Sequence, residues 1–317
     1  MDHDYRLRLR RHYGRLGFAL FCYLALTALT QLGLQLLVLR WAPELTGRGW
    51  YEIAAAMLPM YLIAFPIFVL LLPPAPPREL LVRGEALRLR ELAVFFLMAL
   101  GILYPGNILG LGTDALLGKL LRAPAMGNPL ETLAVETDLW PYVLGTILLA
   151  PILEELTFRK LLLDRMRTID KPAALFFSAL AFGLFHGNVI QFFYAFGVGL
   201  LFGVIYMKTG RIAYTIALHV LVNAVGSLAG LLFLRFVDPS DPFSALVPAL
   251  LMGCWVIVLL AGSVAGIVLL LTRRRSLRVA DGQDLLGPGS RFVLPFLNPG
   301  WILYLFAALA VMLLRYF

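Results

Sequence analysis

The sequence predicts an all-α polytopic integral membrane protein, a bundle of about nine transmembrane helices. Two features of its composition point there: 61% of the 317 residues are hydrophobic and only 15% are charged. Soluble domains are nearer 45–50% apolar and about 25% charged. The third observation is a series of charge-free runs long enough to cross a bilayer. Together these exclude an ordinary soluble domain and a disordered chain, and two cysteines are too few for a disulfide scaffold.

A helix needs about 20 apolar residues to cross the hydrocarbon core. The run 172–207 is too long for one crossing, and Gly187-Asn188 offers a break within it. The run 139–153 is charge-free and is then interrupted by Glu154, Glu155 and Arg159. The expected segments are therefore 16–39, 53–77, 92–113, a segment starting at 139, 172–186, 189–207, 212–234, 242–272 and 292–314.

The basic residues predict a multi-pass cell-membrane protein with its N-terminus in the cytoplasm, because cytoplasmic loops carry an excess of Lys and Arg. Threading the nine segments from a cytoplasmic N-terminus places 21 of the 27 lysines and arginines on that side and six on the other. The net charge of +8 therefore reflects topology. No basic patch is interleaved with aromatics as a nucleic-acid binder needs, so we expect no nucleic-acid partner.

The chain divides into three expected regions. Residues 1–138 hold the N-terminal spans and an external loop, 114–138. Residues 139–235 are expected to form a helical core, and residues 236–317 to hold the C-terminal spans with a basic cytoplasmic loop.

Four polar residues inside the apolar runs mark a candidate site. Ionisable groups within a membrane are costly and usually face the bundle interior at functional sites. With a rise of 1.5 Å per residue, Glu154 lies roughly 16 Å deep, His186 roughly 21 Å, His219 roughly 12 Å and Asn223 roughly 18 Å. Three separate helices thus bring polar groups to one level of the membrane, which predicts a shared site.

Helical spacing refines this prediction. His219 and Asn223 are four residues apart and share one face. Glu155 is four residues before Arg159, which makes that pair a plausible ion pair and leaves Glu154 as the freer carboxylate. Pro151, one turn before Glu154, removes a backbone donor and can open or kink the helix.

These residues suit hydrolysis of an amide without a protein nucleophile. A carboxylate and a histidine can take a proton from water and deliver it to a leaving amine, while a second histidine and an amide can donate to the oxyanion. Glu154, His186 and His219 could alternatively ligate a divalent metal such as zinc, since His₂Glu sites are known. Both routes fit the residues at this point.

The motifs EExxxR at 154–159, FxxxH at 182–186 and HxxxN at 219–223 resemble those of the CPBP family, the CAAX-protease and bacteriocin-processing (Abi) family of intramembrane endopeptidases. The resemblance covers roughly 140–225. It implies a peptide or protein substrate with a membrane-embedded or lipidated tail, reached within the lipid bilayer.

The resemblance also implies roles for these residues. Glu154 would be the catalytic carboxylate, His186 would orient or activate the water, and His219 and Asn223 would stabilise the oxyanion. The remaining motif residues, Glu155, Arg159 and Phe182, would support them.

Two rival functions use the same buried cluster. A transporter or channel could use it as a proton relay, but the sequence lacks the internal repeat expected of many transporters. A non-catalytic scaffold or immunity protein could retain the fold without chemistry.

Overall fold

The computed structural model describes residues 3–77, 84–129, 137–228, 243–279 and 286–317, and the single residues 81, 133, 237 and 241. Within these ranges all regular structure is helical. Among the described residues, six helical segments are long and apolar enough to cross a membrane, or seven if a bent C-terminal pair counts as one. The six are α1 (His3–Trp41), Tyr51–Leu71, α4 (Leu89–Leu121), Leu139–Arg165, α9 (Val189–Thr209) and α12 (Leu246–Thr272). The chain is a polytopic helical membrane protein.

Two of these segments are composite. Tyr51–Leu71 consists of α2 (Tyr51–Leu58), the π-helical η2 (Pro59–Ala64) and α3 (Phe65–Leu71). Leu139–Arg165 contains α6 (Leu139–Tyr142), η4 (Val143–Leu149), α7 (Ala150–Glu155), η5 (Leu156–Leu162) and η6 (Leu163–Arg165).

Fewer of the described helices are long enough to cross a membrane than the nine spans that the sequence predicted. Helices α8 (Lys171–Phe185) and α10 (Ile212–Asn223), which continues as the π-helical η7 (Ala224–Leu228), are apolar but short. A length of 15 residues corresponds to about 22 Å, less than the hydrocarbon thickness. Residues 229–234, the end of the predicted segment 212–234, and residue 235, the end of the predicted core, lie outside the described residues.

The C-terminal span expected at 292–314 contains a bend. Helix α13 (Pro288–Phe296) meets α14 (Pro299–Leu314) at an angle of 66°. The cause is a helix start within the apolar run: the Asn298 side chain accepts a hydrogen bond from the Trp301 N–H at 2.9 Å, and Pro299 occupies the first turn. An Asn cap followed by proline favours a new helix over continuation of the old one.

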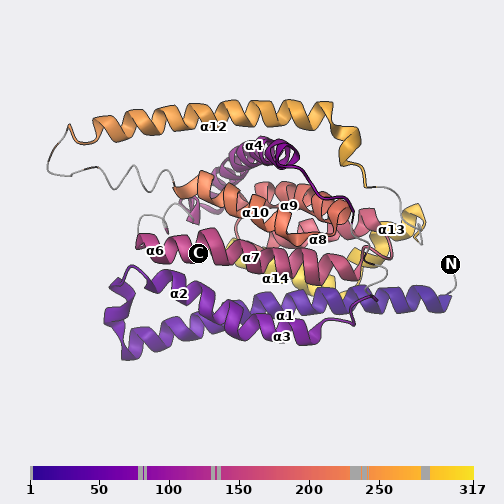
Figure 1. Ribbon diagram of the computed structural model, residues 1–317. Helices are drawn as coiled ribbons and strands as arrows, with labels where there is room; N and C mark the ends of the chain where they lie inside the picture. Colours follow the sequence, from indigo (N-terminus) through magenta and orange to yellow (C-terminus); the bar gives the residue numbers. More distant parts are fainter. Residues whose placement is uncertain are drawn as a thin grey trace.

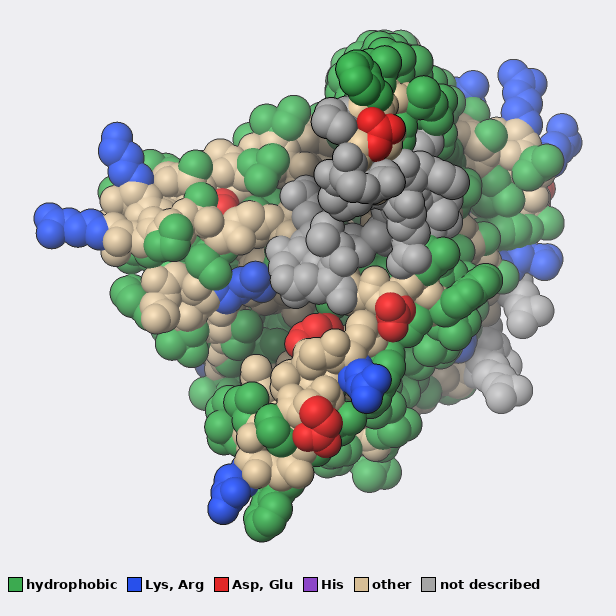
Figure 2. Space-filling view, turned by 90° about the vertical axis from the view of Figure 1, so that its left-hand side faces the viewer, with side chains coloured by type: hydrophobic (Ala, Val, Ile, Leu, Met, Phe, Trp, Pro, Cys, Tyr) green, Lys and Arg blue, Asp and Glu red, His purple; other side chains and the backbone are tan. Residues whose placement is uncertain are grey.

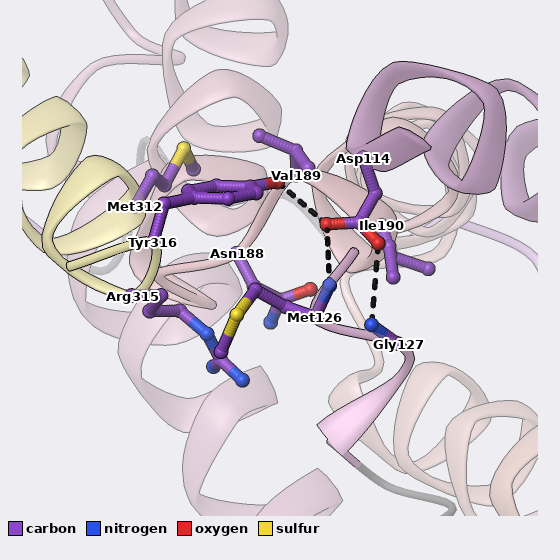
Figure 3. A pocket seen from close by; sticks show the side chains of 9 residues that line it. All are labelled: Asp114, Met126, Gly127, Asn188, Val189, Ile190, Met312, Arg315 and Tyr316. Carbon is purple, nitrogen blue, oxygen red and sulfur yellow. Dashed lines mark hydrogen bonds between the residues drawn. The ribbon is translucent and has the colours of Figure 1, made fainter. Parts of the chain in front are cut away.

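The external loop expected at 114–138 begins later, because α4 continues to Leu121. Asp114 is buried, and its carboxylate accepts hydrogen bonds from the Met126 and Gly127 N–H groups and from the Tyr316 hydroxyl (Figure 3). A charged residue with this many partners is stabilised inside the protein. It therefore fastens the turn after α4 to the C-terminal end of the chain.

The helices run broadly side by side, with the N-terminus and the C-terminus at opposite ends of the bundle (Figure 1). Helix α1 packs on α14, α9 packs on both α8 and α4, and α12 packs on α4 at one edge. Seen from the end that carries α6 and the C-terminus, hydrophobic side chains cover most of the periphery (Figure 2). This distribution is what a lipid-facing surface requires.

Glycines set the closest helix crossings. A Cβ on Gly266 of α12 would collide with the backbone of Leu97, and one on Gly101 of α4 would collide with Gly266 itself. A Cβ on Gly300 of α14 would likewise collide with Gly14 of α1. The Gly262–Gly266 spacing in the sequence therefore marks close helix packing, the usual role of small residues in membrane bundles.

Candidate active site

Glu154 and Glu155 lie at the end of α7, a short α-helical stretch between the π-helical turns η4 and η5. Pro151 in the first turn of α7 has no backbone N–H to complete the α-helical pattern, which accounts for a local change of helical type. Single π-helical turns inside helices are frequent at functional sites.

His186 lies at the break between α8 and α9, where the sequence predicted one. Gly187 has a positive φ of 63°, a conformation that suits glycine. Asn188 then caps α9 by accepting a hydrogen bond from the Gln191 N–H at 2.8 Å. Because α8 ends just before His186 and α9 begins just after Asn188, the His186 imidazole lies at a helix end inside the bundle.

Helix α10 carries His219 and Asn223 on one face, next to the helix that carries the glutamates. The Asn223 amide donates to the Thr146 carbonyl of η4 at 3.0 Å. One amide hydrogen is thereby used to fasten α10 to η4, and the other stays available.

A buried ionic core underlies the site. Glu155 and Arg159 are both 0% exposed, with Glu155 Oε2 3.1 Å from Arg159 Nε. The other carboxylate oxygen, Glu155 Oε1, lies 3.0 Å from His219 Nδ1. Glu155 thus joins the first motif to the third.

Glu154 is the more accessible carboxylate, with 19% of its side chain exposed. Its Oε2 lies 3.7 Å from His219 Nε2, which is too long for a direct hydrogen bond. A water or substrate group beside these two atoms can contact both of them. His186 interacts electrostatically with both Glu154 and His219. The glutamate and both histidines therefore share one locality inside the bundle.

The hydrogen bonds also fix which ring nitrogens can accept protons. A carbonyl or carboxylate oxygen only accepts, so the nitrogen that contacts it carries the hydrogen. His186 Nδ1 donates to the Phe182 carbonyl at 2.8 Å, and His219 Nδ1 donates to Glu155. In the neutral rings, both Nε2 atoms are left as acceptors for a water or substrate group.

The Phe182 ring contacts both histidines and Arg159. Its ring packs edge-on against His186 and His219, with centroid separations of 4.8 and 5.8 Å. The Arg159 guanidinium lies over the same ring, 4.7 Å from the centroid. Six of the seven residues expected from the motifs thus form one connected cluster. The seventh, Asn223, lies one helical turn after His219 and contacts Thr146 of η4.

Sequence motifs gave no indication of three tyrosines near Glu154. Tyr23 of α1, Tyr61 of η2 and Tyr194 of α9 all interact electrostatically with this carboxylate. The Tyr61 hydroxyl is buried and has no hydrogen-bond partner among the described residues. Tyrosines are common in apolar helices, and only the packing of three distant segments brings these to Glu154.

Among the described residues, no three His, Cys, Asp or Glu side chains are arranged to hold a metal ion. The hypothesis that Glu154, His186 and His219 ligate a divalent metal stays a prediction, and Glu154 Oε2 and His219 Nε2 lie 3.7 Å apart.

The fold and cluster define a class: a polytopic helical membrane protein with a glutamate and two histidines gathered inside its bundle. Residues 136–225 match the family model described as Type II CAAX prenyl endopeptidase Rce1-like. These residues therefore form a domain of the CAAX protease family. No curated protein and no solved structure matches the chain.

Proposed function

We propose that the protein is an intramembrane endopeptidase that hydrolyses a peptide bond by means of a Glu154-activated water. The single observation that carries this proposal is the approach of Glu154 Oε2 to His219 Nε2 at 3.7 Å. The other ring nitrogen of His219, Nδ1, donates to the buried Glu155, which orients the ring. A carboxylate and an oriented imidazole facing one small space are the groups that a general acid–base hydrolysis needs.

In the first step, water attacks the carbonyl carbon of the scissile bond. The Glu154 carboxylate takes the proton from the water as its oxygen bonds to carbon, and His186 Nε2 orients the water by accepting its second hydrogen. The carbonyl π electrons move to oxygen. His219 acts here as an imidazolium that has taken one proton from bulk water before the substrate binds. Its Nδ1–H still donates to Glu155, and its Nε2–H and the free Asn223 amide hydrogen donate to the oxyanion, as preorganised donors do in other hydrolases.

In the second step, the oxyanion re-forms the carbonyl and the C–N bond breaks. Glu154 returns its proton to the leaving nitrogen, which departs as an amine, and the other product is a carboxylic acid that ionises. Glu155 accepts from His219 Nδ1 throughout, so the ring keeps one orientation in both steps. Arg159 balances the charge of Glu155 and keeps this acceptor in place.

The substrate is proposed from the membrane setting and from the family of residues 136–225. A CAAX prenyl endopeptidase domain favours a peptide or protein with a prenylated tail held in the bilayer. We further propose nine membrane-inserted segments with a cytoplasmic N-terminus, in which α8 and α10 are short segments. Since α8 is about 22 Å long, a substrate chain must enter the bundle to reach His186.

The test is cleavage of a fluorogenic CAAX peptide by the purified protein in nanodiscs. We expect hydrolysis of a farnesylated peptide and at least about 100-fold slower turnover by Glu154→Gln, since general acid–base groups contribute 10²–10⁴-fold. The matched control is Glu91→Gln, an exposed glutamate at the start of α4 that lies outside the cluster.

An unlipidated peptide of the same sequence tests the substrate separately. Equal cleavage of both peptides would remove the lipidated-tail assignment but keep the hydrolase. Full activity of Glu154→Gln would remove the role of Glu154. Glu154-dependent proton flux in liposomes without cleavage of either peptide would favour a transporter instead.

A further inference from the structure

A second polar feature lies outside the catalytic cluster, where α4 begins and α12 ends. A cavity of about 280 Å³ is lined by Arg90, Glu91 and Val94 of α4, by Arg88 just before this helix, and by Arg273 just after α12. This volume is near the lower end for ligand sites, which run from about 300 Å³ upward. The opening is suited to a compact group.

The cavity carries an excess of positive charge. Glu91 is already engaged, because its carboxylate accepts the Arg88 N–H at 2.8 Å and so caps the first turn of α4. Arg88, Arg90 and Arg273 are exposed and form no ion pair within the described part of the chain. Three guanidinium groups around one hollow favour a phosphate, which Arg binds through paired hydrogen bonds.

The segment after α12 is held in place beside this cavity. The Lys208 ammonium at the end of α9 donates to the Ser276 carbonyl of η8 (Arg274–Leu277). Gly266 of α12, about two turns before Arg273, packs closely on α4 and holds this end of α12 against it. The arginines therefore come from two helices whose relative position is set independently of any ligand.

The surface next to the cavity is apolar and exposed. Leu271 and Val268 of α12 are 67% and 53% exposed, and Leu89 of α4 is 82% exposed. In a membrane protein such side chains face acyl chains. A ligand here meets guanidinium groups at one end and hydrocarbon at the other, which matches a phospholipid better than a free phosphate.

We propose that this cavity binds the phosphate headgroup of an anionic phospholipid, with its acyl chains lying along α12. Basic pockets between transmembrane helices are suited to anionic headgroups. The lipid would bridge α4 and α12 at the end opposite to Asp114 and Tyr316. The proposal does not depend on the catalytic one.

The experiment measures binding of dioleoylphosphatidylglycerol to the full-length protein in a neutral detergent by native mass spectrometry. We expect Arg90→Gln/Arg273→Gln to bind this lipid at least about tenfold more weakly than the unmodified protein, since each basic group near the surface contributes appreciably. The matched control is Arg274→Gln/Arg275→Gln, which removes the same charge just outside the cavity and should change binding less than about threefold.

Three further arms separate the alternatives. Val94→Trp fills the cavity without changing its charge and should also weaken binding. Dioleoylphosphatidylcholine should bind much more weakly than the anionic lipid. Glycerol phosphate, the soluble headgroup, should compete poorly. Equal weakening by both arginine pairs would overturn the proposal in favour of a diffuse basic surface, and tight binding of glycerol phosphate would overturn the lipid assignment.

Discussion

Adjacent glutamates in one motif occupy two different environments. Glu155 is fully buried between Arg159 and His219, whereas Glu154 is partly exposed and has no hydrogen-bond partner of comparable strength among the described residues. Residues one apart on a helix point about 100° from each other, so the two carboxylates cannot share one role. Burial makes Glu155 a positioning group, and access makes Glu154 the group that can meet water.

Removing Glu155 tests this division. Glu155→Ala leaves the buried Arg159 guanidinium without its ion-pair partner, and its Nη1 and Nη2 atoms already have no hydrogen-bond partner in the described structure. Breaking a buried ion pair from one side costs about 3–5 kcal/mol of unfolding free energy. We expect a loss of this size in a denaturant titration in micelles.

Two further variants complete that measurement. Glu155→Gln/Arg159→Met should recover part of the stability without recovering cleavage, because His219 lacks its carboxylate acceptor. Lys160→Met breaks another ion pair four residues apart, but the Lys160 side chain is 48% exposed, so its loss should cost about 1 kcal/mol or less. Similar losses for Glu155→Ala and Lys160→Met would contradict the assigned burial of Glu155.

At the scale of elements, α12 is held to the bundle mainly through α4. The crossing depends on Gly266, where no side chain can fit against the Leu97 backbone. Much of the rest of α12 is exposed, so few other contacts compensate for separation at this point. The attachment of α12 therefore depends strongly on Gly266.

We expect Gly266→Leu to separate α12 from α4 and to lower the midpoint of thermal unfolding in micelles. Overpacking a close crossing typically costs about 1–3 kcal/mol. Gly253→Leu on the same helix is the matched control, because a Cβ there meets no atom within 4 Å. The same midpoint for both variants would show that the crossing is not a tight one.

At the scale of the whole molecule, local patterns predicted the helical class, the break at Gly187-Asn188 and the cluster of motif residues. They failed where the deciding partner is distant in sequence. Helix α4 continues through Asp114 because Gly127 and Tyr316 satisfy its carboxylate. The tyrosines around Glu154 are brought there by packing, which has no periodic signal in the chain.

The orientation of the bundle is the remaining whole-molecule prediction. The excess of Lys and Arg at the end carrying the N-terminus predicts that this end faces the cytoplasm. Replacing Cys22 and Cys254 by Ala gives a background without native thiols. Ser276→Cys, in η8, should then react with a membrane-impermeant maleimide only after lysis, whereas Thr46→Cys in η1 (Pro43–Gly47) should react in intact cells. Both side chains are exposed, so access is limited by the membrane and not by packing. Labelling of Ser276→Cys but not Thr46→Cys in intact cells would mean that the protein is inserted the other way round.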